Sequence, residues 1–345
     1  MTHFHVSRNH CRTTQLVVNE VTFFPLPSPL LHYTLNAPYH LYMIDKIIRE
    51  NNIDVIVMSN VLANTAAIIA AKKNNIPVIF DLVDWLPDSA AAYFKNTWLQ
   101  TIIRNTVWQI TRMNLKFSNK IITVSPTLVE KLRALDFSAE LITNGVDTDI
   151  FKPLDKEEMR KELDIGSEEF IIGFAGSLER WYNLSDMIKA MPELIAHNPN
   201  VRLLIVGGSL FTDYEFELKK LCSKLKISDH VRFVGLKPYA ELPKYIACMD
   251  ICAIPLSPAR WRDIALPNKY FEYTACGKPI IMTPIQDIES IGEGNLFVYR
   301  NKNEYITHIK NLMAHSFKFS QDMEKNSWKE KARQFESIIK RLVNP

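Results

Sequence analysis

Short runs of apolar, mostly β-branched residues alternate with helix-length segments along most of the chain, and this alternation limits the possible folds more than any other feature. In the first half, the runs cover residues 53–58, 77–82, 120–124 and 141–142, with helical patterns at 62–73 and 98–117. In the second half, they cover residues 170–175, 202–206, 231–234, 251–255 and 279–282. Uninterrupted apolar strands between helices indicate parallel sheets that are covered on both faces. The sequence therefore predicts an α/β fold with two tandem Rossmann-like, doubly wound domains.

A polar stretch interrupts this alternation near the middle of the chain and contains Gly145, Pro153 and a charged run. We place a linker at residues 146–168, between an N-terminal domain at residues 1–145 and a C-terminal domain at residues 169–318. Residues 319–345 are predicted to form a closing helix. With 345 residues, 47% of them hydrophobic, the chain can bury two cores of ordinary size. Doubly wound sheets bind ligands at the carboxyl ends of their strands, so we expect the active site in the crevice that the two domains share.

Charge and cysteine content narrow the classes of function. The 41 basic and 38 acidic residues give a net charge of +3 without long blocks of one sign, so nucleic acid is not an expected partner. The five cysteines form no C-x-x-C pair, which suits a reducing, cytoplasmic compartment. An uncharged run at residues 55–71 is interrupted by polar side chains and is too polar to cross a bilayer. The nine histidines show no metal-binding spacing, and no G-x-G-x-x-G follows a strand, so we expect neither a metal nor a dinucleotide cofactor.

The segment ALPNKYFEYTACGKP at residues 265–279 runs from a loop into a helix and then into a buried strand. A helix amino terminus offers unpaired N–H groups and a positive dipole end, which suits a diphosphate beside Leu266, Pro267 and Asn268. Lys269 adds a positive charge there, and Glu272 lies one turn later on the same face as Asn268. A carboxylate in that position can accept two ribose hydroxyls. The segment therefore predicts a nucleotide-binding site.

This segment resembles the second-domain pattern P-x-K-x-x-E-Y-x-A-x-G-K-P of the retaining glycosyltransferases of family 4, matched from Pro267 to Pro279. The sequences NGVD at 144–147, VGG at 206–208 and VRFVG at 231–235 resemble further parts of the family. The alternative to a binding role is that Lys269 and Glu272 form an exposed ion pair on the helix. The length of the matched segment around them favours the binding role. The resemblance covers residues 50–345. It implies a GT-B fold, a nucleotide-diphosphate sugar donor, a glycan or lipid-linked acceptor, and transfer with retention at the anomeric carbon.

The resemblance also implies roles for single donor-site residues. The second glutamate of the family's E-x7-E pair holds the nucleotide ribose and maps onto Glu272, whereas the first falls on Ile264. Asp263, one position away, is then the carboxylate left to face the donor sugar. In the first loop of the second domain, FAGSLERWYN at 174–183, the family grips the diphosphate with a basic side chain. Arg180 is our candidate, together with backbone amides near Gly176 and Ser177.

Three other residues near these motifs receive predictions. Trp181 and Tyr182 are predicted to be packing residues, because large aromatic side chains usually fill a core. Asp84 follows a first-domain strand that in the family often ends in His-Asp facing the donor sugar, and Val83 replaces the histidine. Two interpretations of Asp84 stay open: it faces the sugar or acceptor as a catalytic residue, or it caps the next segment. Catalysis is thus expected to depend on Arg180, Lys269 and Asp84.

The segment from Lys95 to Lys120 is basic without compensation, since it has no acidic residue; its basic residues are Lys95, Arg104, Arg112, Lys116 and Lys120. Together with its tryptophan, leucine and isoleucine residues, this charge is typical of a helix lying on an anionic membrane surface. The alternative is a helix that covers the first domain's sheet with ordinary solvated basic residues. We expect a cytoplasmic protein attached peripherally to the inner membrane face.

The beginning of the chain departs from the family. Residues 2–6 and 20–25 resemble later strands, and the family's usual first strand, Gly-rich loop and first helix are not evident. Two interpretations stay open: the start is misassigned or truncated, or this member lacks a loop that its relatives use near the donor phosphate and acceptor. Two other functions stay open. Val83, Ile264 and the short start motivate a non-catalytic partner of a transferase that binds nucleotide sugar, and the same GT-B fold is also compatible with a nucleotide-sugar epimerase.

Overall fold

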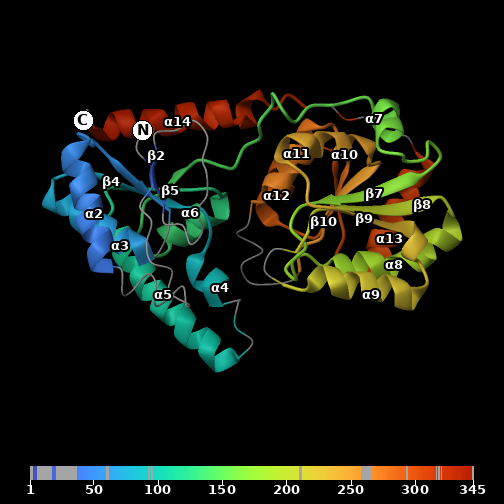
Figure 1. The fold of residues 1–345 in the computed structure, drawn as a ribbon, viewed down its shortest axis with the longest axis horizontal. Helices are drawn as coiled ribbons and strands as arrows, with labels where there is room; N and C mark the ends of the chain where they lie inside the picture. Colours follow the sequence, from blue (N-terminus) through green and yellow to red (C-terminus); the bar gives the residue numbers. More distant parts are fainter. Residues whose placement is uncertain are drawn as a thin grey trace. The chain divides into compact units, whose positions relative to one another are not determined.

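The computed structural model of the chain describes residues 3–5, 18–20, 37–59, 62–91, 94, 96–209, 212–257, 266–292, 294–315, 317, 319 and 321–343 (Figure 1). The chain divides into two compact units. Unit 1 comprises Met1–Val124, Leu128–Leu141 and Glu336–Pro345, and unit 2 comprises Ser125–Thr127 and Ile142–Phe335. Each unit contains a parallel sheet with helices packed on it, so the predicted α/β fold with two Rossmann-like domains is confirmed.

Unit 1 is built on a four-stranded parallel sheet whose strand order is β3 (Ile56–Met58), β4 (Val78–Leu82), β5 (Lys120–Thr123) and β6 (Glu140–Leu141). Its helices are α2 (Ala37–Glu50), α3 (Leu62–Lys73), α4 (Leu86–Ala91), α5 (Thr97–Phe117) and α6 (Pro126–Arg133). The apolar run in β4 is buried, as expected for a central strand covered on both faces. Helix α2 packs against α3, and α5 packs against both α3 and α4.

Near the amino terminus, β1 (His3–His5) pairs in parallel with β2 (Val18–Glu20) as a separate two-stranded sheet. A strand at residues 2–6 was expected, and β1 lies within it. The strand expected at residues 20–25 lies outside the described residues after Glu20.

Unit 2 contains a six-stranded parallel sheet in the order β12 (Leu296–Val298), β11 (Ile280–Met282), β10 (Ile251–Ile254), β7 (Phe170–Ala175), β8 (Val201–Val206) and β9 (Val231–Gly235). Helices α8 (Leu184–His197), α9 (Tyr214–Leu225) and α13 (Lys302–Ala314) cover one face (Figure 1). Helices α10 (Leu242–Cys248), α11 (Asn268–Ala275) and α12 (Gln286–Ile291) lie on the other (Figure 1). The chain leaves the centre of the sheet in opposite directions from β7 and β10, which makes their carboxyl ends the topological switch point.

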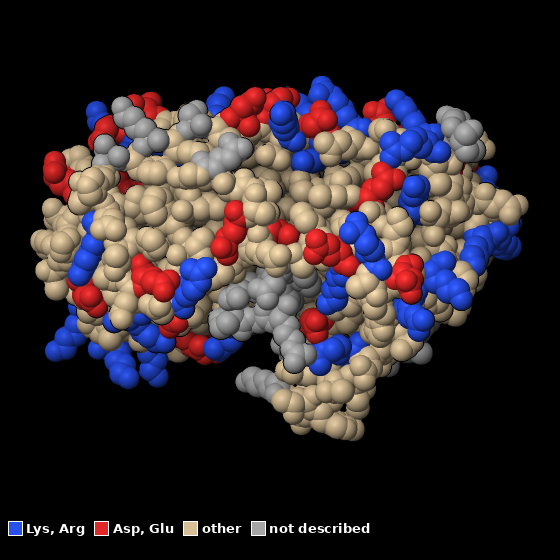
Figure 2. Space-filling model, turned by 180° about the vertical axis from the view of Figure 1, so that it is seen from behind, with Lys and Arg blue, Asp and Glu red and all other residues tan. Residues whose placement is uncertain are grey.

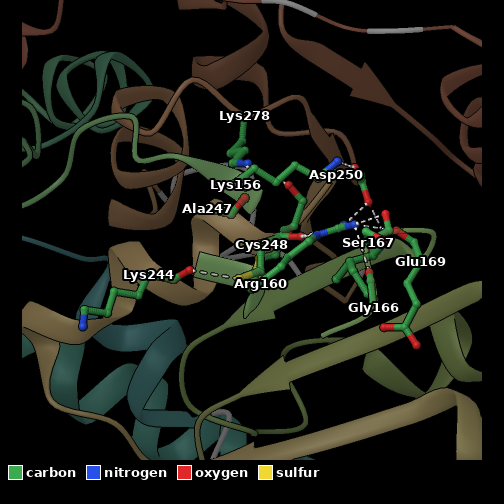
Figure 3. Close-up of polar contacts among 12 residues, drawn as sticks. Lys156, Arg160, Gly166, Ser167, Glu169, Lys244, Ala247, Cys248, Asp250 and Lys278 are labelled. Carbon is green, nitrogen blue, oxygen red and sulfur yellow. Dashed lines mark hydrogen bonds and ion pairs between the residues drawn. The ribbon is translucent and has the colours of Figure 1, made fainter. Parts of the chain in front are cut away.

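Buried charges hold the amino edge of this sheet together (Figure 3). Arg160 of α7 (Lys156–Glu162) is 1% exposed, and it forms a salt bridge of 2.8 Å with Asp250, the residue before β10. The guanidinium also donates to the carbonyl oxygens of Gly166, Ser167, Glu169 and Cys248. Residues 146–168, which we expected to link two domains, therefore fold as part of unit 2, because Arg160 ties α7 to the start of β7 and β10.

Two segments of unit 2 that are far apart in the sequence, near Val146 and near Ser327, lie side by side. Val146 donates its N–H to the carbonyl of Asn326 at 2.9 Å, and Trp328 donates to the carbonyl of Val146 at 3.0 Å. A Cβ atom on Gly145 would lie 2.8 Å from that Asn326 oxygen, so only glycine fits there. This bridge holds residues up to Ser327 out of the last helix, α14 (Trp328–Val343), which therefore begins later than the helix expected from residue 319.

No helix in the described part of the chain is both long and apolar enough to span a bilayer. On the face that Figure 2 displays, basic and acidic side chains are interspersed.

Candidate functional site

Two glycines let the ends of neighbouring strands approach closely at the carboxyl edge of the unit 2 sheet. Gly176 follows β7 with φ +150°, and Gly207 follows β8 with φ +138°. A Cβ atom on Gly207 would lie 1.8 Å from the carbonyl oxygen of Gly176, which no side chain could tolerate. Residues other than glycine rarely adopt these φ values. The backbones that follow β7 and β8 therefore lie in direct contact, beside the switch point.

The loop after β7 is fixed on both sides. Tyr182 forms an antiparallel bridge with Leu256, and Ser257 donates its N–H to the carbonyl of Trp181 at 2.8 Å. On the other side, the fully buried carboxylate of Glu179 accepts a hydrogen bond of 2.8 Å from the hydroxyl of Thr212. These contacts bind the loop to the segment after β10 and to the segment before α9, so the candidate site has a rigid rim.

Helix α11 begins at this rim, and among the described residues no side chain caps its first amides. Pro267 is the N-cap residue and makes no side-chain cap hydrogen bond. The first N–H groups of the helix have no partner within the helix and carry the positive end of its dipole. The side-chain amide of Asn144 donates to the carbonyl of Leu266 at 2.6 Å and holds the approach to the helix. The NGVD motif thus fixes the position of the predicted anion-binding terminus.

Lys269 lies directly against Gly176. Its Nζ donates to the hydroxyl of Tyr182 at 2.8 Å, and it lies 4.4 Å from the centroid of the Tyr182 ring. A Cβ atom on Gly176 would lie 2.3 Å from Lys269 Cε and 2.5 Å from Nζ. The structure thus brings together the lysine, the glycine loop and the amino terminus of α11. Tyr182 packs edge-on against Phe174, as expected for a packing residue, but it also positions the ammonium.

Glu272 lies one turn further along α11 and is 9% exposed. The hydroxyl of Tyr239, in the 3-10 turn Tyr239–Glu241 after β9, donates to Glu272 Oε1 at 3.1 Å. Burial raises the pKa of Glu272, while the Lys269 charge and the Tyr239 hydrogen bond partly offset that increase. The exposed ion pair that we considered as an alternative is not what the structure shows, because Glu272 is buried and Lys269 bonds to Tyr182.

The second half of the matched string has a structural role. Gly277 ends α11 with φ +70°, and Lys278 donates its N–H to the carbonyl of Tyr273 at 3.0 Å, as in a Schellman-type helix end. The hydroxyl of Tyr273 in turn accepts from the N–H of Ala175 at 2.9 Å, which joins α11 to the end of β7. The side chain of Lys278 donates to the carbonyls of Ala247 and Met249 at the amino edge of the sheet (Figure 3).

Arg180 lies on the same loop but bonds elsewhere. Its guanidinium donates to Glu217 at 2.7 Å and to Asp213 at 3.1 Å, and its side chain is 54% exposed. It also lies over the Tyr214 ring, at 5.6 Å from the centroid. Its proposed contact with a diphosphate remains a prediction. That contact would require Arg180 to leave the two carboxylates beside α9.

In unit 1, Asp84 is engaged by its own turn. Its carboxylate accepts the N–H of Trp85 at 2.7 Å and the hydroxyl of Ser89, both at the start of α4. Burial raises the pKa of Asp84, and these hydrogen bonds partly offset the rise. The structure therefore shows the capping contacts of the second interpretation, while the catalytic role stays a prediction.

The remaining donor-site candidates are Asp263, Ser177 and Asn268. Asp263 and Ile264 lie outside the described residues. Ser177 is half-buried beside Gly176, and Asn268 is exposed at the start of α11. In the described ranges, no group of three His, Cys, Asp or Glu side chains could hold a metal ion.

Sequence reasoning missed Tyr239 and did not foresee the hydrogen bond made by Tyr182. One signal was available for Tyr239: in a doubly wound sheet every loop that follows a strand lies at the carboxyl edge, so the loop after β9 was a candidate.

Two parallel-sheet units of Rossmann type, with an uncapped helix terminus at the switch point of the second, define the class of protein as GT-B. The chain belongs to a family described as glycosyl transferases group 1, whose model matches residues 155–334. A second family model, Glycosyltransferase Family 4, matches residues 5–150.

Two curated relatives show what the chain is similar to. The D-inositol 3-phosphate glycosyltransferase of Corynebacterium jeikeium is 30% identical over 227 residues, which are 64% of this chain and 49% of the relative. A GDP-mannose-dependent monoacylated alpha-(1-6)-phosphatidylinositol monomannoside mannosyltransferase of Corynebacterium glutamicum is 34% identical over 150 residues, 41% of this chain and 37% of the relative. The matched part of the chain thus spans between a third and half of these relatives.

Solved structures share the fold at low sequence identity. Sucrose-phosphate synthase from Thermosynechococcus elongatus has a TM-score of 0.76 at 18% identity, with 93% of this chain and 80% of that chain covered. Anabaena HepE in complex with UDP and glucose has a TM-score of 0.64 at 20% identity, with 95% and 83% covered.

Proposed function

We propose that the protein is a glycosyltransferase that moves a sugar from a nucleotide-diphosphate sugar to an acceptor hydroxyl with retention at the anomeric carbon. The observation that carries the proposal is the convergence of Lys269, Gly176 and the uncapped amino terminus of α11 at the switch point, one turn from the buried Glu272. Family membership supports the reaction class. Retention rests on the resemblance to the family 4 enzymes.

In this proposal, the helix terminus and Lys269 bind the diphosphate and stabilise the negative charge that grows as the sugar leaves. Among the described residues, Lys269 is held by the hydroxyl of Tyr182 and not by a carboxylate, so it can turn to a phosphate without breaking an ion pair with them. Glu272 accepts the ribose hydroxyls. No side chain is assigned as a nucleophile, so the residues act by binding, orientation and charge stabilisation.

The relatives suggest which substrates to test first. One uses GDP-mannose and acts on a phosphatidylinositol mannoside, and a structural neighbour has been solved in complex with UDP-glucose. We therefore propose a nucleotide-diphosphate sugar as donor and a glycan or lipid-linked acceptor, with no cofactor needed.

Calorimetric titration of Glu272→Ala with UDP-glucose and with GDP-mannose tests the site. We expect a loss on the order of 1.5–3 kcal/mol in donor binding, because a charge-assisted acceptor of two hydroxyls is removed. Glu289→Ala, which removes an exposed glutamate from α12, is the matched control and should bind like the wild type. Equal affinity of the wild type and Glu272→Ala for every donor would rule out the assigned role.

Product analysis separates the proposed activity from the two alternatives. A transferase consumes donor only when an acceptor hydroxyl is present and yields a glycoside. An epimerase converts the donor without an acceptor, and a non-catalytic partner binds the donor without turnover. Either of the last two results would replace the proposed reaction.

We also propose peripheral attachment to an anionic, cytoplasmic membrane face through the outward side of α5. Trp98 and Ile102 are 70% and 41% exposed there, and Arg112 and Lys116 lie further along the same side. The opposite side of the helix buries Leu115 and packs in unit 1. A helix with exposed aromatic and aliphatic residues beside basic residues is suited to an interface with anionic lipid.

The structure changes which basic residues can serve this surface. Arg104 forms a salt bridge with Asp88 at 2.6 Å, and Lys120 forms one with Glu140 at 3.0 Å. Lys95 lies outside the described residues. Lys72 of α3 lies 3.6 Å from the centroid of the Phe117 ring at the end of α5 and adds a charge to the surface.

Sedimentation with anionic-lipid vesicles at low and high salt tests this attachment. We expect Lys72→Gln/Arg112→Gln/Lys116→Gln to pellet less than the wild type at low salt. The control Lys46→Gln/Lys120→Gln/Lys340→Gln removes the same charge from residues already in salt bridges, and it should pellet like the wild type. If the wild type stays in the supernatant at low salt, the membrane proposal fails and a soluble acceptor becomes the better hypothesis.

A further inference from the structure

We propose that Tyr239 is a positioning residue, whose hydroxyl orients Glu272 and keeps it an ionised acceptor for the ribose hydroxyls. This inference rests on the proposed nucleotide-sugar site and adds a residue to it that the sequence pattern does not contain. Tyr239 lies 33 positions from Glu272 in the chain, and only the fold brings the two together.

Tyr239 is held from behind, so its hydroxyl has a defined direction. Its ring packs against Phe151 with a centroid distance of 5.0 Å and an interplanar angle of 58°. Phe151 is 1% exposed and therefore forms a fixed support in the core. From this support the hydroxyl reaches Glu272 Oε1 at 3.1 Å. Tyr239 as a whole is 46% exposed, so the residue is also reached by solvent.

The charge of Lys269 and the hydroxyl of Tyr239 both favour the ionised carboxylate, but only Tyr239 bonds to it directly. Lys269 carries the nearest positive charge on α11, but its ammonium donates to Tyr182. Within the described residues, the Tyr239 hydroxyl is the one hydrogen-bond donor to the Glu272 side chain. The other titratable groups near the pair supply no positive charge: they are Tyr273 on α11, Cys276 directly after it, and Asp147 beside Tyr239.

Ionisation decides how well Glu272 can bind a ribose. An ionised carboxylate offers about four lone-pair positions, so it can accept from Tyr239 and from two ribose hydroxyls at once. A protonated carboxyl becomes a donor at one oxygen and loses acceptor capacity there. Burial favours the protonated form, and a hydrogen bond to the charged form opposes it. Removal of the Tyr239 hydroxyl should therefore make donor binding fail at a higher pH.

The experiment compares the wild type with Tyr239→Phe by calorimetric titration with UDP-glucose and with GDP-mannose across the acidic and neutral range, because a diphosphate esterified at both ends does not itself titrate there. We expect the pH at which binding is half lost to rise by about one unit in the variant, which is about a tenfold weaker affinity at the acidic end. Tyr245→Phe is the matched control. Tyr245 lies on α10, and its ring packs under Lys237 and not against Glu272. It should leave the pH profile unchanged.

A second background separates positioning from a structural role. Glu272→Gln cannot ionise, so its binding should lack the acid limb, and adding Tyr239→Phe to it should leave the profile flat. Equal weakening by Tyr239→Phe at every pH, or no change at all, would overturn the proposal. Thermal denaturation of both Tyr239 variants shows whether the fold is kept.

If the protein binds neither nucleotide sugar, the proposed function is rejected. The interaction between Tyr239 and Glu272 can still be tested without a ligand. The carboxyl carbon of Glu272 can be titrated by 13C NMR without ligand, with its signal assigned by its loss in Glu272→Gln. A pKa of Glu272 that rises in Tyr239→Phe supports the proposed interaction, and an unchanged pKa overturns it.

Discussion

At the amino edge of the unit 2 sheet, Arg160 is buried and is bonded to a carboxylate and to four carbonyl groups (Figure 3). At the carboxyl edge of the same sheet, the ammonium of Lys269 and the carboxylate of Glu272 each bond to a single tyrosine hydroxyl among the described residues. Both edges thus hold a buried charged group, Arg160 at one and Glu272 at the other, and Lys269 is half-buried. They differ in how many hydrogen bonds those groups have.

The number of hydrogen-bond partners indicates whether a charged group stabilises the fold or is available to bind a ligand. A buried charge that is fully hydrogen-bonded has no capacity left for a ligand, and its loss leaves partners unsatisfied. A charge with few partners costs free energy in the empty protein but can bind an anion or a hydroxyl. We therefore expect substitutions at the amino edge to lower the free energy of unfolding, and substitutions at the carboxyl edge to lower activity.

The largest effect is expected for Arg160→Met. The substitution leaves Asp250 and the surrounding carbonyl groups without the guanidinium, so we expect a loss of about 3–5 kcal/mol in the free energy of unfolding. Urea denaturation measures it, with Lys161→Met, an exposed neighbour on α7, as the control. If both variants lose the same stability, the buried network does not hold this edge.

At the other edge, Lys269→Ala should lower the turnover number by a factor of about 10²–10³, because it removes a charge that meets the leaving diphosphate. Steady-state kinetics with saturating donor measures this effect. Tyr182→Phe, which removes only the hydroxyl that holds the ammonium, should have a much smaller effect. An increase in the Michaelis constant at unchanged turnover would contradict the transition-state role of Lys269.

Arg180→Ala sharpens the comparison, since Arg180 already has two carboxylate partners. If Arg180 also meets the diphosphate, its loss should lower the turnover number about tenfold, or about 1.4 kcal/mol. Glu217→Gln weakens the competing ion pair and should act in the opposite direction. Wild-type kinetics for Arg180→Ala would show that this loop carries no phosphate contact.

The smallest effect is expected in unit 1, where burial raises the pKa of Asp81 on β4 to about 6. Because the folded state binds this proton more tightly than the unfolded state, stability should fall as the pH rises from about 4 to about 6. Asp81→Asn should remove this slope. It should gain about 1 kcal/mol above pH 6, after allowance for partial exposure of the carboxyl. Denaturation curves at several pH values test this gain. A gain in the free energy of unfolding that stays constant from pH 4 to pH 6 would show that burial of the charge is not its cause.

Much of the fold could be predicted because it depends on local patterns. The helix expected at residues 62–73 is α3, and the apolar runs expected to be strands lie within one to three residues of the observed strand ends. β12 was missed, since its three residues are only half-buried at the edge of the sheet and make a short apolar signal. Residues 146–168 have a polar pattern that is typical of a linker. They fold as part of unit 2 because a polar residue, Arg160, bonds to Asp250, and an apolar pattern cannot reveal such a contact.

The sequence by itself determined which residues we propose as the binding groups for the diphosphate and the ribose. Lys269 and Glu272 are one helical turn apart, and the helix terminus before them is encoded within the same few residues, so spacing alone placed them together. The tertiary structure decided what each charge bonds to. Tyr239 reaches Glu272, Arg180 turns to Glu217, and Arg160 meets Asp250 across separations of 33, 37 and 90 positions. Such contacts depend on strand order and on the positions where loops leave the sheet, which no local pattern contains.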